Sequence, residues 1–236
     1  MASLLDQPVG IAGVPDSPTP ASPRVVFVEQ RTARVRLVVG GTVFLMGTVP
    51  NVVNTGGERG LLGIALDPAW PARPYLYVHY TDNRSANHIA VSRFTVTGDL
   101  AFTGTGSLQF DPATRYDLLK NLSDNAGNHN GGTVRFGPDG ALYVSLGDDA
   151  TQCPAQVLTF LGGKVLRLDV TRLPATGTGP PPFAILCPPA IRSPPTPIPA
   201  RGWCGPTACA IPSDSASIRE RATSSLPTLV RATGRS

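Results

Sequence analysis

The sequence predicts an all-β protein built from short antiparallel strands joined by tight turns. The 236 residues include 25 glycines and 25 prolines, a composition that favours turns over long helices. Apolar runs of strand length recur along the first 170 or so residues and are separated by Gly, Pro, Asn and Asp. No apolar run approaches the length that a membrane-spanning helix needs.

The first predicted strands form a hairpin followed by a buried strand. Residues Arg34–Val39 alternate in polarity, turn at Gly40-Gly41 and resume at Thr42–Leu45, a pattern typical of a hairpin. The apolar runs before and after it are Val25–Val28 and Leu61–Leu66.

Later strands repeat this organisation. The predicted strands are Tyr75–Tyr80 and Ile89–Val96, then, after a long loop, Thr133–Phe136, Leu142–Leu146 and Val165–Asp169. Short strands at this spacing are typical of a sandwich, a barrel or a propeller. Residues 133–146 form the unit strand, Gly-Pro-Asp-Gly turn, strand, and residues 66–80 give a weaker echo of it. This favours a propeller because propellers repeat one hairpin-rich sheet per blade.

The charge distribution divides the chain in two. The net charge is +4, but the first 173 residues carry 14 basic and 14 acidic side chains, so the excess lies in the remainder. A nucleic-acid-binding body is therefore not expected. We assign residues 5–173 to the propeller and residues 174–236 to an irregular tail, which holds 13 of the 25 prolines and three of the four cysteines.

Three blocks carry a family resemblance. They are Gly57–Pro68, His129–Asp148 and Leu161–Asp169. In this order and spacing they resemble the glucose/sorbosone dehydrogenase family, over roughly residues 5–173. The resemblance implies a six-bladed β-propeller, of which this body would supply about three blades. It also implies the quinone cofactor PQQ above the central channel, a small-molecule sugar as substrate, an external electron acceptor, and a periplasmic or extracellular location. Residues 1–10 show no signal peptide.

His129 and Asp148 match the catalytic positions of that family. The resemblance implies that His129 takes the proton from the sugar C1 hydroxyl, while hydride passes to PQQ, and that Asp148 orients the imidazole. Imidazole suits the task because it is largely neutral near pH 7 and reprotonates readily. A tight hairpin would bring both residues to one end of a sheet.

Other interpretations of these residues stay open. A histidine in the Asn- and Gly-rich stretch Asn128–Gly132 can be a solvated loop residue, and Asp148-Asp149 can cap a turn or help to hold Ca²⁺. His79 and His88 lie in or beside strand patterns and are expected to be structural. No Cys-x-x-Cys spacing occurs, and no metal site is assigned.

Glu58 departs from the family pattern. It matches a cofactor-binding position at which the PQQ-using glucose enzymes have glutamine. PQQ carries carboxylates, so an ionised Glu58 would repel it unless the glutamate is protonated or paired.

The tail can be read as family sequence in another frame. With the third base of each codon joined to the next two bases, Thr207–Ser213 can encode Tyr-Gly-Leu-Arg-Asn-Pro-Phe, and the family has a Tyr-Gly-Leu-Arg-Asn-Pro segment at this point, whose Arg-Asn contacts PQQ. We therefore hypothesise a frameshift between about residues 173 and 201, which would make this chain an inactive fragment.

The leading functional hypothesis is a PQQ-dependent sugar dehydrogenase. Alternatives are a non-enzymatic propeller that binds carbohydrate or protein on the same face, slightly favoured by Glu58, and a calcium-dependent lactonase-like hydrolase, for which the carboxylates are few.

Overall fold

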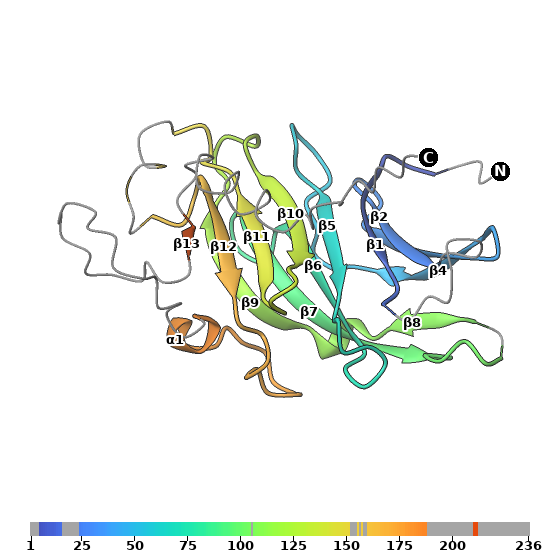
Figure 1. Ribbon diagram of the computed structural model, residues 1–236. Coiled ribbons are helices and arrows are strands. Elements are labelled where there is room, and N and C mark those ends of the chain that lie inside the picture. Colours follow the sequence, from blue (N-terminus) through green and yellow to red (C-terminus); the bar gives the residue numbers. More distant parts are fainter. Residues whose placement is uncertain are drawn as a thin grey trace, which may run out of the picture.

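Antiparallel strands make up almost all of the regular structure (Figure 1). The computed structural model describes residues 5–15, 24–104, 106–151, 155, 157 and 160–187, and the backbone of 210–211. Within them, the first sheet contains β1 (Pro8–Gly13), β2 (Val25–Glu29), β3 (Arg34–Val39) and β4 (Thr42–Thr48). The second contains β5 (Leu61–Leu66), β6 (Tyr75–Asp82), β7 (His88–Gly98), β8 (Leu108–Phe110) and β9 (Tyr116–Ser123). The third contains β10 (Gly131–Phe136), β11 (Leu142–Leu146), β12 (Lys164–Leu168) and β13 (Ala210–Ile211). The all-β prediction is confirmed.

Each sheet is an antiparallel meander that begins with an inner strand. The strands follow chain order within each sheet, except that both β8 and β9 pair with β7. The inner strand β5 lies between β1 and β10. Glycine is needed at this approach, because a Cβ on Gly63 of β5 would lie 1.9 Å from the carbonyl oxygen of Gly132 in β10. The three sheets contact one another through their inner strands β1, β5 and β10, and this arrangement forms a partial propeller.

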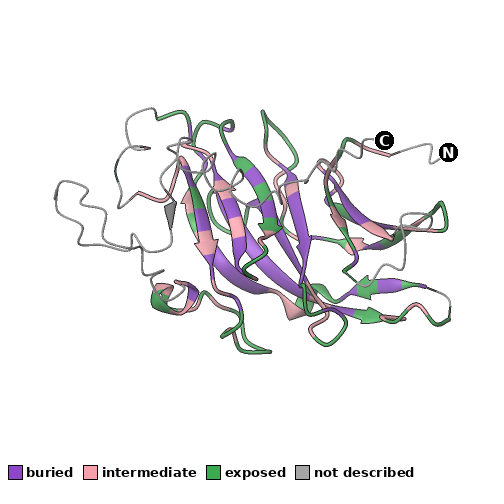
Figure 2. Ribbon diagram, viewed as in Figure 1, coloured by how far each residue is buried: buried purple, intermediate pink, exposed green. Residues whose placement is uncertain are grey.

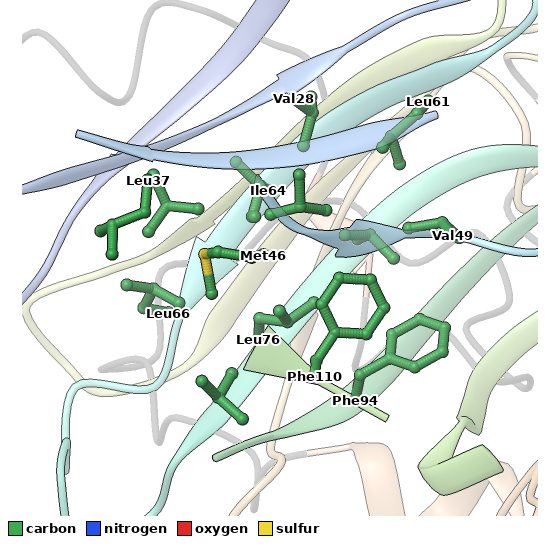
Figure 3. Packing of buried hydrophobic residues seen from close by; sticks show 14 of the residues in the cluster. Val28, Leu37, Met46, Val49, Leu61, Ile64, Leu66, Leu76, Phe94 and Phe110 are labelled. Atoms are coloured by element: carbon green, nitrogen blue, oxygen red, sulfur yellow. The ribbon is translucent and has the colours of Figure 1, made fainter. Parts of the chain in front are cut away.

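Two hydrophobic cores fill the spaces between successive sheets. The first and second sheets enclose one core, which includes Leu37, Met46, Ile64 and Phe94 (Figure 3). The second and third sheets enclose another, which includes Tyr77, Leu142 and Leu166. The second sheet is thus covered on both faces and is the most continuously buried (Figure 2).

The prediction of a long loop after β7 is wrong. Residues 108–123 form β8, the 3₁₀ helix η1 (Pro112–Thr114) and β9. Strand β9 gives no alternating signal because Tyr116, Asp117, Leu118 and Leu119 are all buried. Asp117 is tolerated there because Arg84 and Ser92 donate hydrogen bonds to its carboxylate. Strand β1 was also not predicted.

Residues 174–187, which we assigned to the tail, pack against the body. Arg93 of β7 donates to the carbonyls of Pro174 and Ala175. The short helix α1 (Phe183–Leu186) places Leu186 in the second core. The domain boundary at residue 173 stays a prediction, as does most of the tail beyond residue 187, which lies outside the described residues. No helix in the described residues is long and apolar enough to cross a membrane.

Candidate active site

His129 and Asp148 meet at the end of the β10–β11 hairpin. His129 precedes β10, and Asp148 follows β11. The His129 Nδ1 lies 2.8 Å from Asp148 Oδ1. The His129 side chain is 55% exposed, so its ring is open to a ligand while it is held at one nitrogen. The predicted proximity of these two residues is confirmed by this contact; their catalytic role stays a prediction.

The β10–β11 hairpin brings His129 and Asp148 together through its turn and its glycines. The predicted turn at residues 137–140 closes with a hydrogen bond from Gly140 N to Gly137 O. At the other end Gly131 pairs with Leu146. The His129 carbonyl then lies directly against Gly147, where a Cβ would be 1.3 Å from the His129 oxygen. Only glycine at position 147 allows the His129 loop to cross the strand end.

The Asp148 carboxylate both orients His129 and caps a turn. Its pKa is lowered, first by the hydrogen bond with His129 and further by the Ala150 amide, which lies 3.2 Å from Oδ1. An ionised Asp148 accepts a hydrogen bond from His129 Nδ1–H, and in the neutral ring this places the hydrogen on Nδ1. This tautomer leaves Nε2 with a free lone pair, which is the arrangement that a general base requires.

Glu58 contacts the loop that carries His129. Its carboxylate Oε2 accepts a hydrogen bond from Asn130 N at 3.3 Å, and its own amide donates to Gly127 O at 2.9 Å. Glu58 is exposed. The structure therefore brings all three predicted site residues to one end of the molecule.

The cations beside Glu58 are already engaged. Arg59 forms an ion pair with Asp124 at 2.9 Å, and Arg31 donates to the carbonyls of Gly57 and Arg59. The described residues around His129 therefore fit the proton-accepting half of a quinoprotein site. Within the described part of the chain, the cations beside Glu58 are Arg59, which is already paired with Asp124, and Arg31, whose hydrogen bonds all go to neutral oxygens.

A pocket opens beside His129, between the second and third sheets. Its volume is about 340 Å³, and its lining includes Ile89, Asn130, Leu146, Asp149 and Phe160. Asn130 is buried, and its side-chain oxygen has no hydrogen-bond partner within the described part of the chain. Apolar walls with a few polar groups are typical of a small-molecule site.

Sequence reasoning gave Asp124 no role and considered Asp149 only as a turn cap or a Ca²⁺ ligand together with Asp148. Both are buried carboxylates that hold the His129 loop rather than face solvent. Only the adjacency of Asp149 to Asp148 could have indicated its position, because its partners lie in a loop without periodicity.

The two histidines expected to be structural lie in the second sheet. His79 is fully buried, and both of its ring nitrogens lack a hydrogen-bond partner among the described residues. His88 is buried near Asp82, with 3.6 Å between Nε2 and Oδ2. The described residues contain no group of three or more His, Cys, Asp or Glu side chains arranged to hold a metal, so the possible Ca²⁺ stays a prediction.

Comparison with known proteins points to one family. The profile described as glucose/sorbosone dehydrogenase matches residues 5–178. Human Hedgehog-interacting protein is 31% identical over 187 residues, which is 72% of this chain and 25% of that protein. Quinoprotein glucose dehydrogenase B of Acinetobacter calcoaceticus is 28% identical over 156 residues, which is 62% of this chain and 29% of that protein.

Solved structures agree with this match. A putative glucose dehydrogenase from Thermus thermophilus superposes with a TM-score of 0.56 at 32% identity, covering 69% of this chain and 44% of the other. The PQQ-bound form of aldose sugar dehydrogenase from Streptomyces coelicolor gives 0.55 at 27% identity, covering 74% and 50%. The chain thus spans half or less of the length of these relatives.

Proposed function

Because the chain belongs to the glucose/sorbosone dehydrogenase family, we propose that the intact protein oxidises an aldose or related sugar at its C1 hydroxyl. One observation carries the proposal. A half-exposed imidazole is held at Nδ1 by an ionised carboxylate, beside a pocket of small-molecule size.

His129 acts in this proposal as the general base. Asp148 fixes the Nδ1–H tautomer, so Nε2 takes the proton of the C1 hydroxyl and Asp148 stabilises the imidazolium that forms. A positioned general base typically contributes about 10²- to 10⁴-fold to the rate. Removal of the proton prepares the C1–H bond to release hydride.

PQQ, when bound, would supply the hydride acceptor, and an external electron acceptor would then reoxidise it. His129 and Glu58 would border it. The carboxylates of the quinone need cationic partners, and the Arg-Asn pair of the frameshifted reading would provide one. The frameshift is therefore part of the proposal. A frameshift implies that the chain as translated is inactive. A periplasmic or extracellular location accords with the resemblance.

The test is reconstitution of the frame-corrected, full-length protein with PQQ and Ca²⁺. Dye reduction is followed with a panel of aldoses, and PQQ binding is followed by its absorbance. We expect PQQ to bind and at least one aldose to reduce the dye. Failure to bind PQQ would exclude the dehydrogenase assignment. A coding sequence whose shifted frame is closed by stop codons would exclude the frameshift.

A second candidate is a non-enzymatic propeller that binds carbohydrate or protein on the His129 face. It is favoured by the 31% identity to human Hedgehog-interacting protein and by the negative charge of Glu58. A frame-corrected protein that takes up no PQQ, oxidises no aldose, and yet retains a ligand on this face would support it.

A further inference from the structure

We propose that Asp149 is a positioning residue, which fixes the loop of residues 123–130 so that the His129 ring meets Asp148. Contacts between Asp149 and the loop of residues 123–130 support this role. Its consequence for turnover rests on the proposed function.

The His129 loop needs external support. His129 itself has a φ of 56°, and Gly127 a φ of 72°, so the backbone passes twice through the left-handed region. This region is unfavourable for a side chain such as that of histidine, and it persists where surrounding contacts enforce it. The loop must therefore be held from outside.

Asp149 supplies three of these contacts. Its Oδ1 accepts from Ala126 N at 2.8 Å, and its Oδ2 accepts from Ser123 Oγ at 2.5 Å and from Asn125 Nδ2 at 3.3 Å. Asp149 is only 6% exposed. Burial raises its pKa, but the hydrogen bonds from Ser123 and Ala126 outweigh that effect and the pKa is lowered.

Asp148 and Asp149 hold the same loop at two points. Asp149 binds the first part of the loop, and Asp148 binds His129 at its end. Because the two carboxylates are adjacent in the chain, we expect a shift of the loop at Ala126 to move His129 relative to Asp148.

The segment just before β5 also holds the loop. Arg59 donates to Asp124 Oδ2 at 2.9 Å and to its carbonyl at 2.7 Å. A Cβ on Gly57 would lie 2.0 Å from Gly127 O, so the two loops are in backbone contact. Asp149, just after β11, and Arg59, just before β5, are therefore two separate anchors of the loop.

These contacts also argue against Asp149 as a calcium ligand. Both of its oxygens already accept from protein donors, and the described residues around it form no group of three or more His, Cys, Asp or Glu side chains that could hold Ca²⁺. Calcium binding that depends on Asp149 is therefore an outcome that contradicts the proposal.

The experiment compares Asp149→Asn with Asp139→Asn in the full chain. Asp139 is the matched control, because it also accepts three hydrogen bonds, from Ala141 N, Tyr143 OH and Arg167 Nε, at the opposite end of the same hairpin. The measurements are the His129 tautomer by ¹⁵N NMR and the hydrogen exchange of the Ala126 amide. Loss of signals in His129→Gln assigns the imidazole.

We expect Asp149→Asn to accelerate Ala126 exchange at least ~10-fold and to remove the Nδ1–H preference of His129, while Asp139→Asn changes neither. Ser123→Ala, which leaves the carboxylate intact, should give a smaller change in the same direction and serves if Asp149→Asn does not fold. The proposal would be overturned if Asp149→Asn and Asp139→Asn behaved equally, or if Ca²⁺ were taken up and Asp149→Asn abolished this uptake. If Asp149→Asn does not fold, an absence of any effect in Ser123→Ala would overturn it.

A readout in the frame-corrected protein separates positioning from general stability. Asp149→Asn should lower kcat with little change in KM. If the NMR results are as expected but no aldose is oxidised, the proposed function fails and the positioning role stands.

Discussion

The His129 ring is held at one nitrogen and open at the other, which is the feature that suits it to proton transfer. Asp148, 23% exposed, keeps a lowered pKa through its hydrogen bond with His129, so it remains ionised at neutral pH. Asp148 stabilises the fold above its ordinary pKa of 3.8, and this contribution is lost as the pH falls through the lowered folded value.

His79 gives a pH prediction of its own. Burial lowers the pKa of His79 from 6.5 to about 4. Between pH 6.5 and 4 the unfolded chain therefore binds a proton that the folded chain does not, and stability falls as the pH falls through this window. The shift corresponds to at most about 3 kcal/mol.

We expect His79→Leu to flatten the dependence of the free energy of unfolding on pH between 6.5 and 4. Urea titrations at several pH values measure this slope, and comparison of slopes avoids the absolute cost of the substitution. A slope in His79→Leu equal to that of the unsubstituted chain would show that His79 does not contribute.

The sequence was sufficient at the residue scale where a local motif defined the geometry. His129 and Asp148 could be placed together because the Gly-Pro-Asp-Gly turn sets a tight hairpin. Asp149 could not, because its partners Ser123, Asn125 and Ala126 lie in a loop whose path depends on the second sheet.

Among the elements, strands were predictable where one face is buried or a turn marks their end. Strands β2 to β7 and β10 to β12 were predicted within a few residues. Strand β9 was not, because it is buried on both faces and contains Asp117, whose charge is compensated only in the folded structure. Strand β1 contains two glycines and one proline and gives no strand signal.

The contact between inner strands gives a sharp test at this scale. A methyl group on Gly63 would collide with the Gly132 carbonyl, so Gly63→Ala must separate β5 from β10. We expect a loss of about 3 kcal/mol or more, at the upper end of the cost of overpacking. Gly13→Ala is the control because nothing lies within 4 Å of the added carbon. Chemical denaturation measures both, and equal stabilities would contradict this packing.

At the scale of the whole molecule, the three sheets of the described residues enclose two cores, and apolar side chains remain exposed on the first and third sheets. Leu45 is 51% exposed and Val165 40% exposed. A propeller reaches full stability when its first and last blades pair and edges are removed.

Under the frameshift hypothesis, the frame-corrected protein should therefore unfold at a higher temperature, and with a steeper transition, than the chain as translated. Differential scanning calorimetry of both proteins measures this difference. If the two proteins had the same Tm, or if the chain as translated had the higher Tm, the described sheets would form a stable unit without further blades.

His129, oriented by Asp148, is in our proposal the base of a sugar dehydrogenase, and this central claim has a direct test. The measurement is kcat for aldose oxidation in the frame-corrected, PQQ-loaded protein with His129→Ala. We predict a fall in kcat of about 10²- to 10⁴-fold with PQQ still bound. A kcat close to that of the unsubstituted protein would contradict the claim.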